Sequence, residues 1–147
     1  MKIALFTPLN PIKTGISDYN EEMLFELRKH LDIDIYIQKG YIPTNESIRT
    51  QFNIIPYDSK SFDIHKYDEI LYHMGNNYEA HGYIYEALKL HPGVVVLHDF
   101  VMQGFHAERY DATGDFEMYR QLQKKYYGEQ GESIANNIAR PQALPIW

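Results

Sequence analysis

The chain has 147 residues, no cysteine and a formal net charge of −6 at pH 7. This length suits one domain with a substantial core, and the lack of cysteine excludes disulfides and thiolate metal sites. The acidic balance argues against broad nucleic-acid binding, which needs clustered Lys and Arg. The first apolar run, Ile3–Phe6, is too short for a signal-peptide core or a membrane span, so we expect a soluble, cytoplasmic protein.

The N-terminal residues predict a strand, a helix and a second strand. Residues 2–7 are a strand candidate, followed by an irregular loop that contains two prolines. The next apolar residues recur at three- and four-residue steps and predict a helix, with Thr14 or Ser17 as its cap: Ile16, Tyr19, Met23, Leu24, Leu27 and Leu31. Residues 33–37 alternate as a strand does. Together these elements form a βαβ unit, which is right-handed in nearly all proteins.

The middle of the chain is harder to interpret. Residues 38–66 contain many loop-forming residues, and only a short strand at 52–55 is indicated. A strand at 69–74 then leads into Gly75-Asn76-Asn77, and a helix is expected from about 79 to 90.

The stretch Gly93–Phe100 organises the prediction. Its four apolar residues do not alternate and include three valines, which indicates a strand buried on both faces, at the centre of a sheet. His98 and Asp99 follow at the C-terminal end of this strand, where open α/β sheets bind their ligands. Asp99 is also well placed to cap the next helix. The sequence therefore predicts a Rossmann-like, mostly parallel sheet flanked by helices.

Beyond Asp99 the pattern is helical. One helix is expected around Phe105, a second is capped by Asp115, and a third follows Gly131. Residues 140–147 form a proline-broken segment with no return strand. We expect one domain over residues 1–147, with 111–147 as its helical extension. Because alternating α/β chains normally close their sheet with a further strand, this domain is either complete with a helical tail or a fragment of a two-domain protein.

Three segments resemble the N-terminal domain of family-four retaining glycosyltransferases, enzymes with two Rossmann-like domains (the GT-B fold). They are Gly15–Tyr19 (GISDY), Tyr72–Asn76 (YHMGN) and His91–Phe100 (HPGVVVLHDF), of which the last is the most specific. These enzymes transfer a sugar from a nucleotide diphosphate to an acceptor with retention of the anomeric configuration. The resemblance runs from Met1 to about Tyr110.

The resemblance implies that His98 is the catalytic residue, beside the donor sugar, where its imidazole holds a hydroxyl or the positive charge of the transition state. From the residues alone, a histidine packed at a strand end remains the more common alternative. Gly15 and Ile16, at a helix start, would contact the donor or the acceptor through backbone N–H groups. The alternative for Gly15 is a plain turn glycine.

Four further residues are candidates for donor or acceptor binding. His73, Gly75 and Asn76 end a neighbouring strand and would share the crevice of His98 on the acceptor side. A turn in which Asn76 caps the next helix explains that segment nearly as well. Asp99 is a candidate binding residue, although a helix cap is its more common role. No cofactor is expected.

Metal binding is not indicated. Asp32-Ile33-Asp34 has the Asp-x-Asp spacing of a metal-dependent class of glycosyltransferase, but it precedes a strand at the edge opposite the expected site. We interpret it as a solvated turn. No pair of histidines has the spacing of a zinc-binding helix.

The paired glutamates that this family carries eight positions apart, in its C-terminal domain, have no counterpart here. The resemblance thus implies that the chain needs a missing C-terminal domain, which grips the nucleotide-sugar donor, and is inactive alone. The acceptor would be a sugar, a glycan or a lipid-linked molecule, so membrane contact is compatible but not indicated. The alternative is a stand-alone, non-catalytic Rossmann-like module that binds a nucleotide or sugar.

Overall fold

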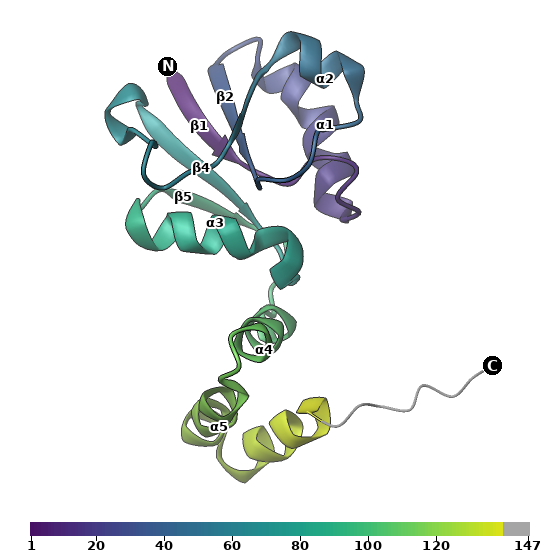
Figure 1. The fold of residues 1–147 in the computed structure, drawn as a ribbon, viewed down its shortest axis with the longest axis vertical. Helices are drawn as coiled ribbons and strands as arrows, with labels where there is room; N and C mark the ends of the chain where they lie inside the picture. Colours follow the sequence, from purple (N-terminus) through teal and green to yellow (C-terminus); the bar gives the residue numbers. More distant parts are fainter. Residues whose placement is uncertain (140–147) are drawn as a thin grey trace, which may run out of the picture. The chain divides into compact units, whose positions relative to one another are not determined.

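Five strands form one parallel sheet in the computed structural model, which describes residues 1–139. The order across the sheet is β3-β2-β1-β4-β5, and every neighbouring pair is parallel (Figure 1). The expected Rossmann-like α/β fold is confirmed. The strand bounds are β1 Lys2–Phe6, β2 Asp32–Ile37, β3 Asn53–Pro56, β4 Glu69–Met74 and β5 Val94–Leu97.

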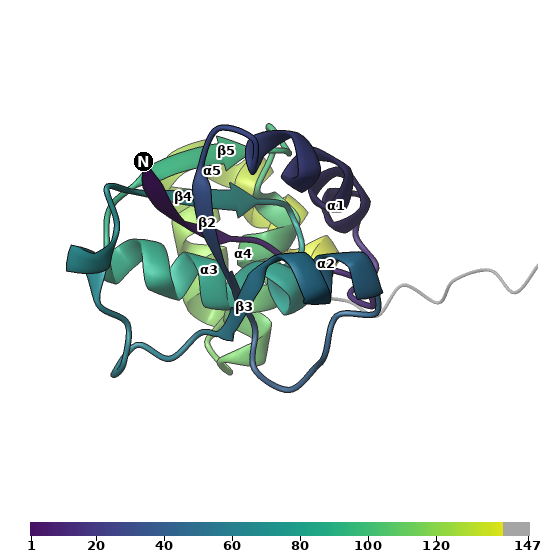
Figure 2. The ribbon, with the colours of Figure 1, turned by 90° about the horizontal axis from the view of Figure 1, so that it is seen from above.

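Helices cover both faces of this sheet, as the apolar strands require. Helices α1 (Gly15–Leu27) and α2 (Glu46–Gln51) lie on one face, and α3 (Tyr78–Leu90) lies on the other (Figures 1 and 2). A short 3-10 turn, η1 (Ile64–Lys66), precedes β4. The core on the α1 face is aliphatic and consists of Ile3, Leu5, Leu9, Leu24, Ile33, Ile35, Ile37 and Ile48.

The opposite face of the sheet holds a cluster of aromatic rings. Phe6 stacks on Tyr36 with ring centroids 4.9 Å apart and contacts Tyr72 at the same separation. Tyr57 and Phe62 meet Phe6 edge to face, at 5.1 and 5.5 Å. Such offset and edge-to-face pairs add stability beyond the buried area alone. The alternation along β1 and β2 therefore separates an aliphatic face from an aromatic face.

The predicted position of the Gly93–Phe100 strand was wrong. Strand β5 is the edge of the five-stranded sheet, and Val94 and Leu97 are 50% and 51% exposed. The central strand is β1, where Ile3–Phe6 are at most 2% exposed. A run of apolar residues predicts two buried faces, but it carries no information on how many strands lie beside it.

A second compact unit begins at Val101. It contains α4 (Gln103–Ala112) and α5 (Phe116–Ala139), which pack through Ala107, Tyr119 and Ala135. Gly128, with φ 65° and ψ −153°, interrupts α5. The predicted break between the second and third helices therefore exists, but it lies at Gly128 and not at Gly131. Gly128 has a positive φ, a conformation that glycine adopts at little cost. The predicted proline-broken segment, 140–147, lies outside the described residues.

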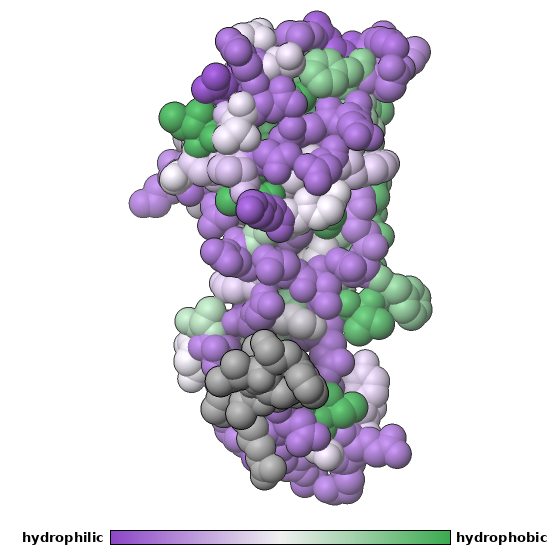
Figure 3. All heavy atoms as spheres, turned by 90° about the vertical axis from the view of Figure 1, so that its right-hand side faces the viewer, coloured by the Kyte–Doolittle hydropathy of each residue, from purple (hydrophilic) through white to green (hydrophobic). Residues whose placement is uncertain are grey.

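Hydrophilic side chains predominate on the face shown in Figure 3. In the described part of the chain, no helix combines the length and apolarity needed to cross a bilayer.

Candidate functional site

The candidate site lies where β1, β4 and β5 end and where α1 and α3 begin. An open hollow of about 530 Å³ is present there, which we call the edge pocket. All the residues that line it belong to the first unit: Thr14, Gly15, Ile16, Tyr19, Asn76, Asn77, His81, His98 and Asp99. Polar side chains at the C-terminal ends of neighbouring parallel strands meet at one edge of the sheet, which is why these distant segments converge.

The predicted site residues divide into two groups by depth. Gly15, Ile16, Asn76, His98 and Asp99 line the edge pocket. His73 and Gly75 do not line it and lie buried beside it, with His73 only 1% exposed. All seven residues therefore gather at the same edge of the sheet, but His73 is enclosed by the protein.

His73 and His98 are joined by a hydrogen bond between their rings. Nδ1 of His73 lies 2.8 Å from Nε2 of His98, and the ring centroids are 5.0 Å apart. The backbone N–H of His98 also donates to the Met74 carbonyl at 2.9 Å, which extends the β4–β5 ladder by one bond. The exposed Tyr19 packs edge to face on His98, with centroids 5.3 Å apart. His98 is thus held from three sides while one part of its ring borders the pocket.

Asp99 does not cap the following helix, so that expectation was wrong. Helix α4 begins at Gln103, and Met102 at the cap position makes no side-chain hydrogen bond. Asp99 instead accepts a 2.6 Å hydrogen bond from the backbone N–H of Asn76. Its carboxylate therefore ties the end of β5 to the end of β4.

The turn after β4 is tightly packed. A Cβ added at Gly75 would lie 2.5 Å from Cδ1 of Ile16, 3.0 Å from the His81 ring and 3.2 Å from the Asp99 carboxylate. A side chain at position 75 would therefore force Ile16 to shift, because α1, α3 and the end of β5 converge on this point. The cap of α3 is Asn77, which accepts from the Ala80 N–H at 2.8 Å, and not Asn76.

Gly15 shows the opposite situation. It is the first residue of α1, its φ is not positive, and nothing lies within 4 Å of a Cβ built there. Thr14 caps the helix by accepting from the Ser17 N–H at 3.1 Å. Neither strain nor packing among the described residues requires glycine at position 15.

His81 is a site residue that the sequence analysis missed. It lies on α3, is 1% exposed and lines the edge pocket. Its Nδ1 lies 2.9 Å from the Asn77 carbonyl, which can only accept, so Nδ1 carries a proton and donates. Nε2 has no hydrogen-bond partner among residues 1–139. The available signal was a histidine on the apolar stripe of this helix, with Ala80, Ile84 and Ala87.

The imidazoles of the site are uncharged at neutral pH. Burial, with a smaller contribution from the neighbouring His98, lowers the pKa of His73 to about 4. Burial also lowers the pKa of His81 and of His98. None of the residues that line the edge pocket is Lys or Arg. The pocket therefore offers neutral hydrogen-bonding groups and the N-terminal ends of two helices, which attract partial negative charge.

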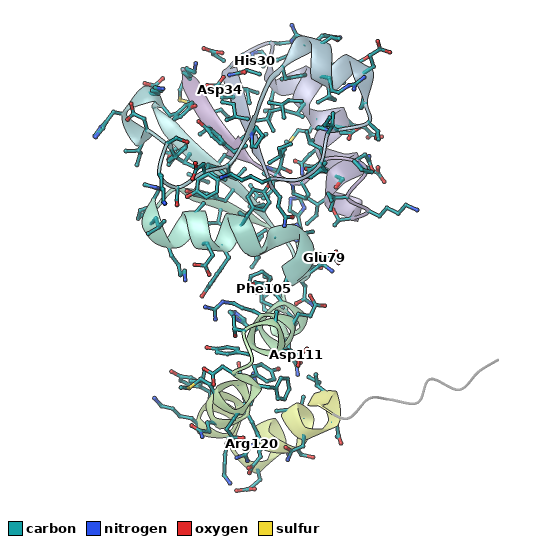
Figure 4. The ribbon with its side chains drawn as sticks, viewed as in Figure 1. His30, Asp34, Glu79, Phe105, Asp111 and Arg120 are labelled. Atoms are coloured by element: carbon teal, nitrogen blue, oxygen red, sulfur yellow. The ribbon has the colours of Figure 1, made fainter. Side chains whose placement is uncertain are left out.

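The Asp32-Ile33-Asp34 segment is not a solvated turn, which corrects the interpretation from sequence. Both aspartates lie in β2, and Asp34 is only 7% exposed. Asp34 accepts hydrogen bonds from Asn53 and Tyr67, each at 2.9 Å, and pairs with Lys2 at 3.2 Å. Figure 4 shows Asp34 and Glu79, at the start of α3, at opposite ends of the sheet. Asp34 is thus part of a structural network remote from the edge pocket.

No group of three His, Asp or Glu side chains within residues 1–139 is arranged to hold a metal ion. A second hollow, of about 480 Å³, shares Thr14 and Asn77 with the edge pocket and extends past Lys13 toward Lys39.

Comparison with known proteins gives no match: no family model, no curated protein and no solved structure is significantly similar to this chain.

Proposed function

We propose that this chain is the N-terminal half of a retaining glycosyltransferase, which moves a sugar from a nucleotide-sugar donor to an acceptor and is inactive without a second domain. The observation that carries the proposal is the convergence of the resembling segments. Residues from GISDY, YHMGN and HPGVVVLHDF, which lie far apart in the sequence, border one hollow at the ligand-binding edge of a Rossmann-like sheet.

The chemistry of the edge pocket supports a ligand rich in hydroxyl groups. A hydroxyl both donates and accepts hydrogen bonds, and the pocket provides the acceptor oxygens of Asp99 beside the neutral imidazole of His98. The bare position at Gly15 leaves the backbone at the start of α1 open to close approach by a ligand. His98 is the proposed catalytic residue and would hold the donor sugar.

The second hollow supports a place for the acceptor. It adjoins the edge pocket through Thr14 and Asn77, so a molecule bound there would lie next to a sugar held by His98. In this arrangement Thr14 and Asn77, which line both hollows, lie between the two ligands, and closure of a second domain over the edge would exclude water from the reaction.

The test uses the complete gene product, incubated with labelled UDP-glucose, UDP-galactose, GDP-mannose and ADP-glucose and with mixed glycan and lipid acceptors. Transfer is expected from at least one donor, and His98→Ala should reduce both transfer and donor hydrolysis by about 100-fold or more. His30→Ala, a change at an exposed histidine beyond the end of α1, is the matched control and should leave both rates unchanged.

Unchanged rates in His98→Ala would show that this residue has a different role. Two further outcomes would contradict the proposal. The first is sugar transfer by the 147-residue chain alone, because no second domain would then be needed. The second is a gene product that ends at Trp147 and binds a nucleotide sugar without transferring it, which would instead establish the non-catalytic binding module.

A further inference from the structure

The hydrogen bond between His73 and His98 determines which nitrogen of each ring carries a proton. A neutral imidazole carries one proton, so a single N–H can lie between Nδ1 of His73 and Nε2 of His98. Either His98 donates through Nε2–H, or His73 donates through Nδ1–H. The two arrangements present different groups to the pocket, because the second nitrogen of His98 carries a lone pair in the first case and a proton in the second.

The surroundings of His73 discriminate between these arrangements. Its other nitrogen, Nε2, is buried and has no hydrogen-bond partner within the described part of the chain. If His98 donated, the proton of His73 would have to sit on Nε2, as a buried N–H without an acceptor. If His73 donates, Nε2 carries only a lone pair. Buried N–H groups without a partner are the rarer and costlier of the two defects.

We propose that His73 is a positioning residue that donates its Nδ1–H to Nε2 of His98 and thereby holds His98 in the Nδ1–H tautomer. His98 then offers an N–H donor, and its lone pair is already occupied. It binds an oxygen of its ligand and does not act as a general base. The tautomer assignment is independent of the proposed function, but the identity of that oxygen as part of a donor sugar rests on it.

The pocket then offers a ligand one donor and one acceptor from this pair of segments. His81 donates its Nδ1–H to Asn77, and its Nε2 is buried, so it presents no free polar atom to a ligand. His98 accepts on Nε2 and keeps a proton on Nδ1, and Asp99 adds a carboxylate that only accepts. This combination suits a ligand with hydroxyl groups, which can meet donors and acceptors at once, better than a ligand with acceptor oxygens alone.

The test is the tautomer of His98 in the ligand-free chain, measured from the two imidazole nitrogens by long-range ¹H–¹⁵N NMR and assigned with His98→Gln. We expect a protonated Nδ1 and an unprotonated Nε2. His73→Leu removes the donor and should shift His98 toward the Nε2–H form. His73→Asn places an amide N–H near the position of Nδ1 and should restore the Nδ1–H form.

An Nε2–H tautomer of His98 in the unaltered protein would overturn the proposal, as would an unchanged tautomer in His73→Leu. If His73→Leu does not fold, the unaltered protein and His73→Asn still decide the question. In the complete gene product, His73→Leu should lower sugar transfer about tenfold and His73→Asn should recover it. Because the NMR measurement needs no ligand, the tautomer can be confirmed even where no transfer is found, and only the proposed function then fails.

Discussion

The burial of His73 predicts that acid destabilises this protein. His73 is 1% exposed, and burial lowers its pKa to about 4 from an ordinary value of 6.5. Below about pH 6.5 the unfolded chain takes up a proton that the folded chain refuses, so falling pH favours unfolding. The loss begins near the unfolded pKa and ends near the folded pKa, where both states are protonated.

The size of the effect follows from the difference between the two pKa values. Each unit corresponds to about 1.4 kcal/mol, so a fall from 6.5 to about 4 gives a maximum loss of about 3 kcal/mol. Between about pH 7 and about pH 5, His73 alone should lower the free energy of unfolding by about 2 kcal/mol. This is a large part of the 5–15 kcal/mol by which a domain is typically stable.

The assay is urea unfolding at a series of pH values, followed by far-UV circular dichroism, on the unaltered protein and on His73→Asn. The variant keeps a hydrogen-bonding side chain at this position but does not titrate, so its stability should fall by about 2 kcal/mol less over the same range. His30→Gln, at the exposed histidine labelled in Figure 4, is the control and should follow the unaltered protein.

Parallel loss of stability in the unaltered protein and in His73→Asn would refute this reasoning, because His73 would then have the same proton affinity in both states. His81, whose pKa is also lowered by burial, is present in both proteins and contributes equally to both curves. An NMR titration of the His73 ring protons gives an independent value for the folded state.

Two further substitutions test the packing of the sheet edges. Gly75→Ala should lower the free energy of unfolding by about 1–3 kcal/mol in urea, since its Cβ would lie 2.5 Å from Ile16, whereas Gly15→Ala, with no atom within 4 Å, should not destabilise. Asp34→Ala leaves Asn53, Tyr67 and Lys2 without their acceptor and should lower the free energy of unfolding by about 2 kcal/mol in the same assay. Asp32→Ala is the control. It changes an exposed carboxylate that lies 3.9 Å from Lys2, so its effect should be near zero.

Much of the sheet could be predicted because the period of the apolar residues decides secondary structure directly. The alternation in residues 33–37 and the stripe that includes Leu24 gave β2 and α1 to within a few residues. The gathering of Gly15, Asn76 and His98 also followed from sequence, since parallel strands place their C-terminal ends at one edge. That convergence needs only the strand directions, not the order of the strands.

Strand order and short elements were beyond prediction for physical reasons. Strand β5 lies at the edge because only β4 pairs with it in the described sheet. The residues of β5 itself do not indicate whether a second strand pairs with it. Helix α2 has six residues and one buried anchor, Ile48, so it has no apolar stripe to detect. Its N-cap residue, Asn45, can be read from the sequence, but an Asn in a loop-rich region is equally typical of a turn.

The roles of individual polar residues were the least predictable part of the site. Asp99 stands where a helix cap is common, yet it bonds to Asn76, 23 positions earlier, because the β4 and β5 ends are adjacent. The same adjacency brings the buried His73 within hydrogen-bonding distance of His98, 25 positions later. Local propensity describes neighbours in the chain, whereas these contacts arise from neighbours in the sheet.

Under the proposed function, the charge of the edge pocket limits how well the pocket can bind the diphosphate of a nucleotide sugar. Its imidazoles are neutral because they are buried, Asp99 contributes a carboxylate, and no Lys or Arg is among the lining residues. The N-termini of α1 and α3 supply only partial positive charge, which is too little to neutralise a diphosphate. A nucleotide sugar held here would therefore be bound through its hydroxyl groups, and its phosphates would need cationic residues from outside the edge pocket, either Lys13 and Lys39 of the adjoining hollow or residues of a second domain.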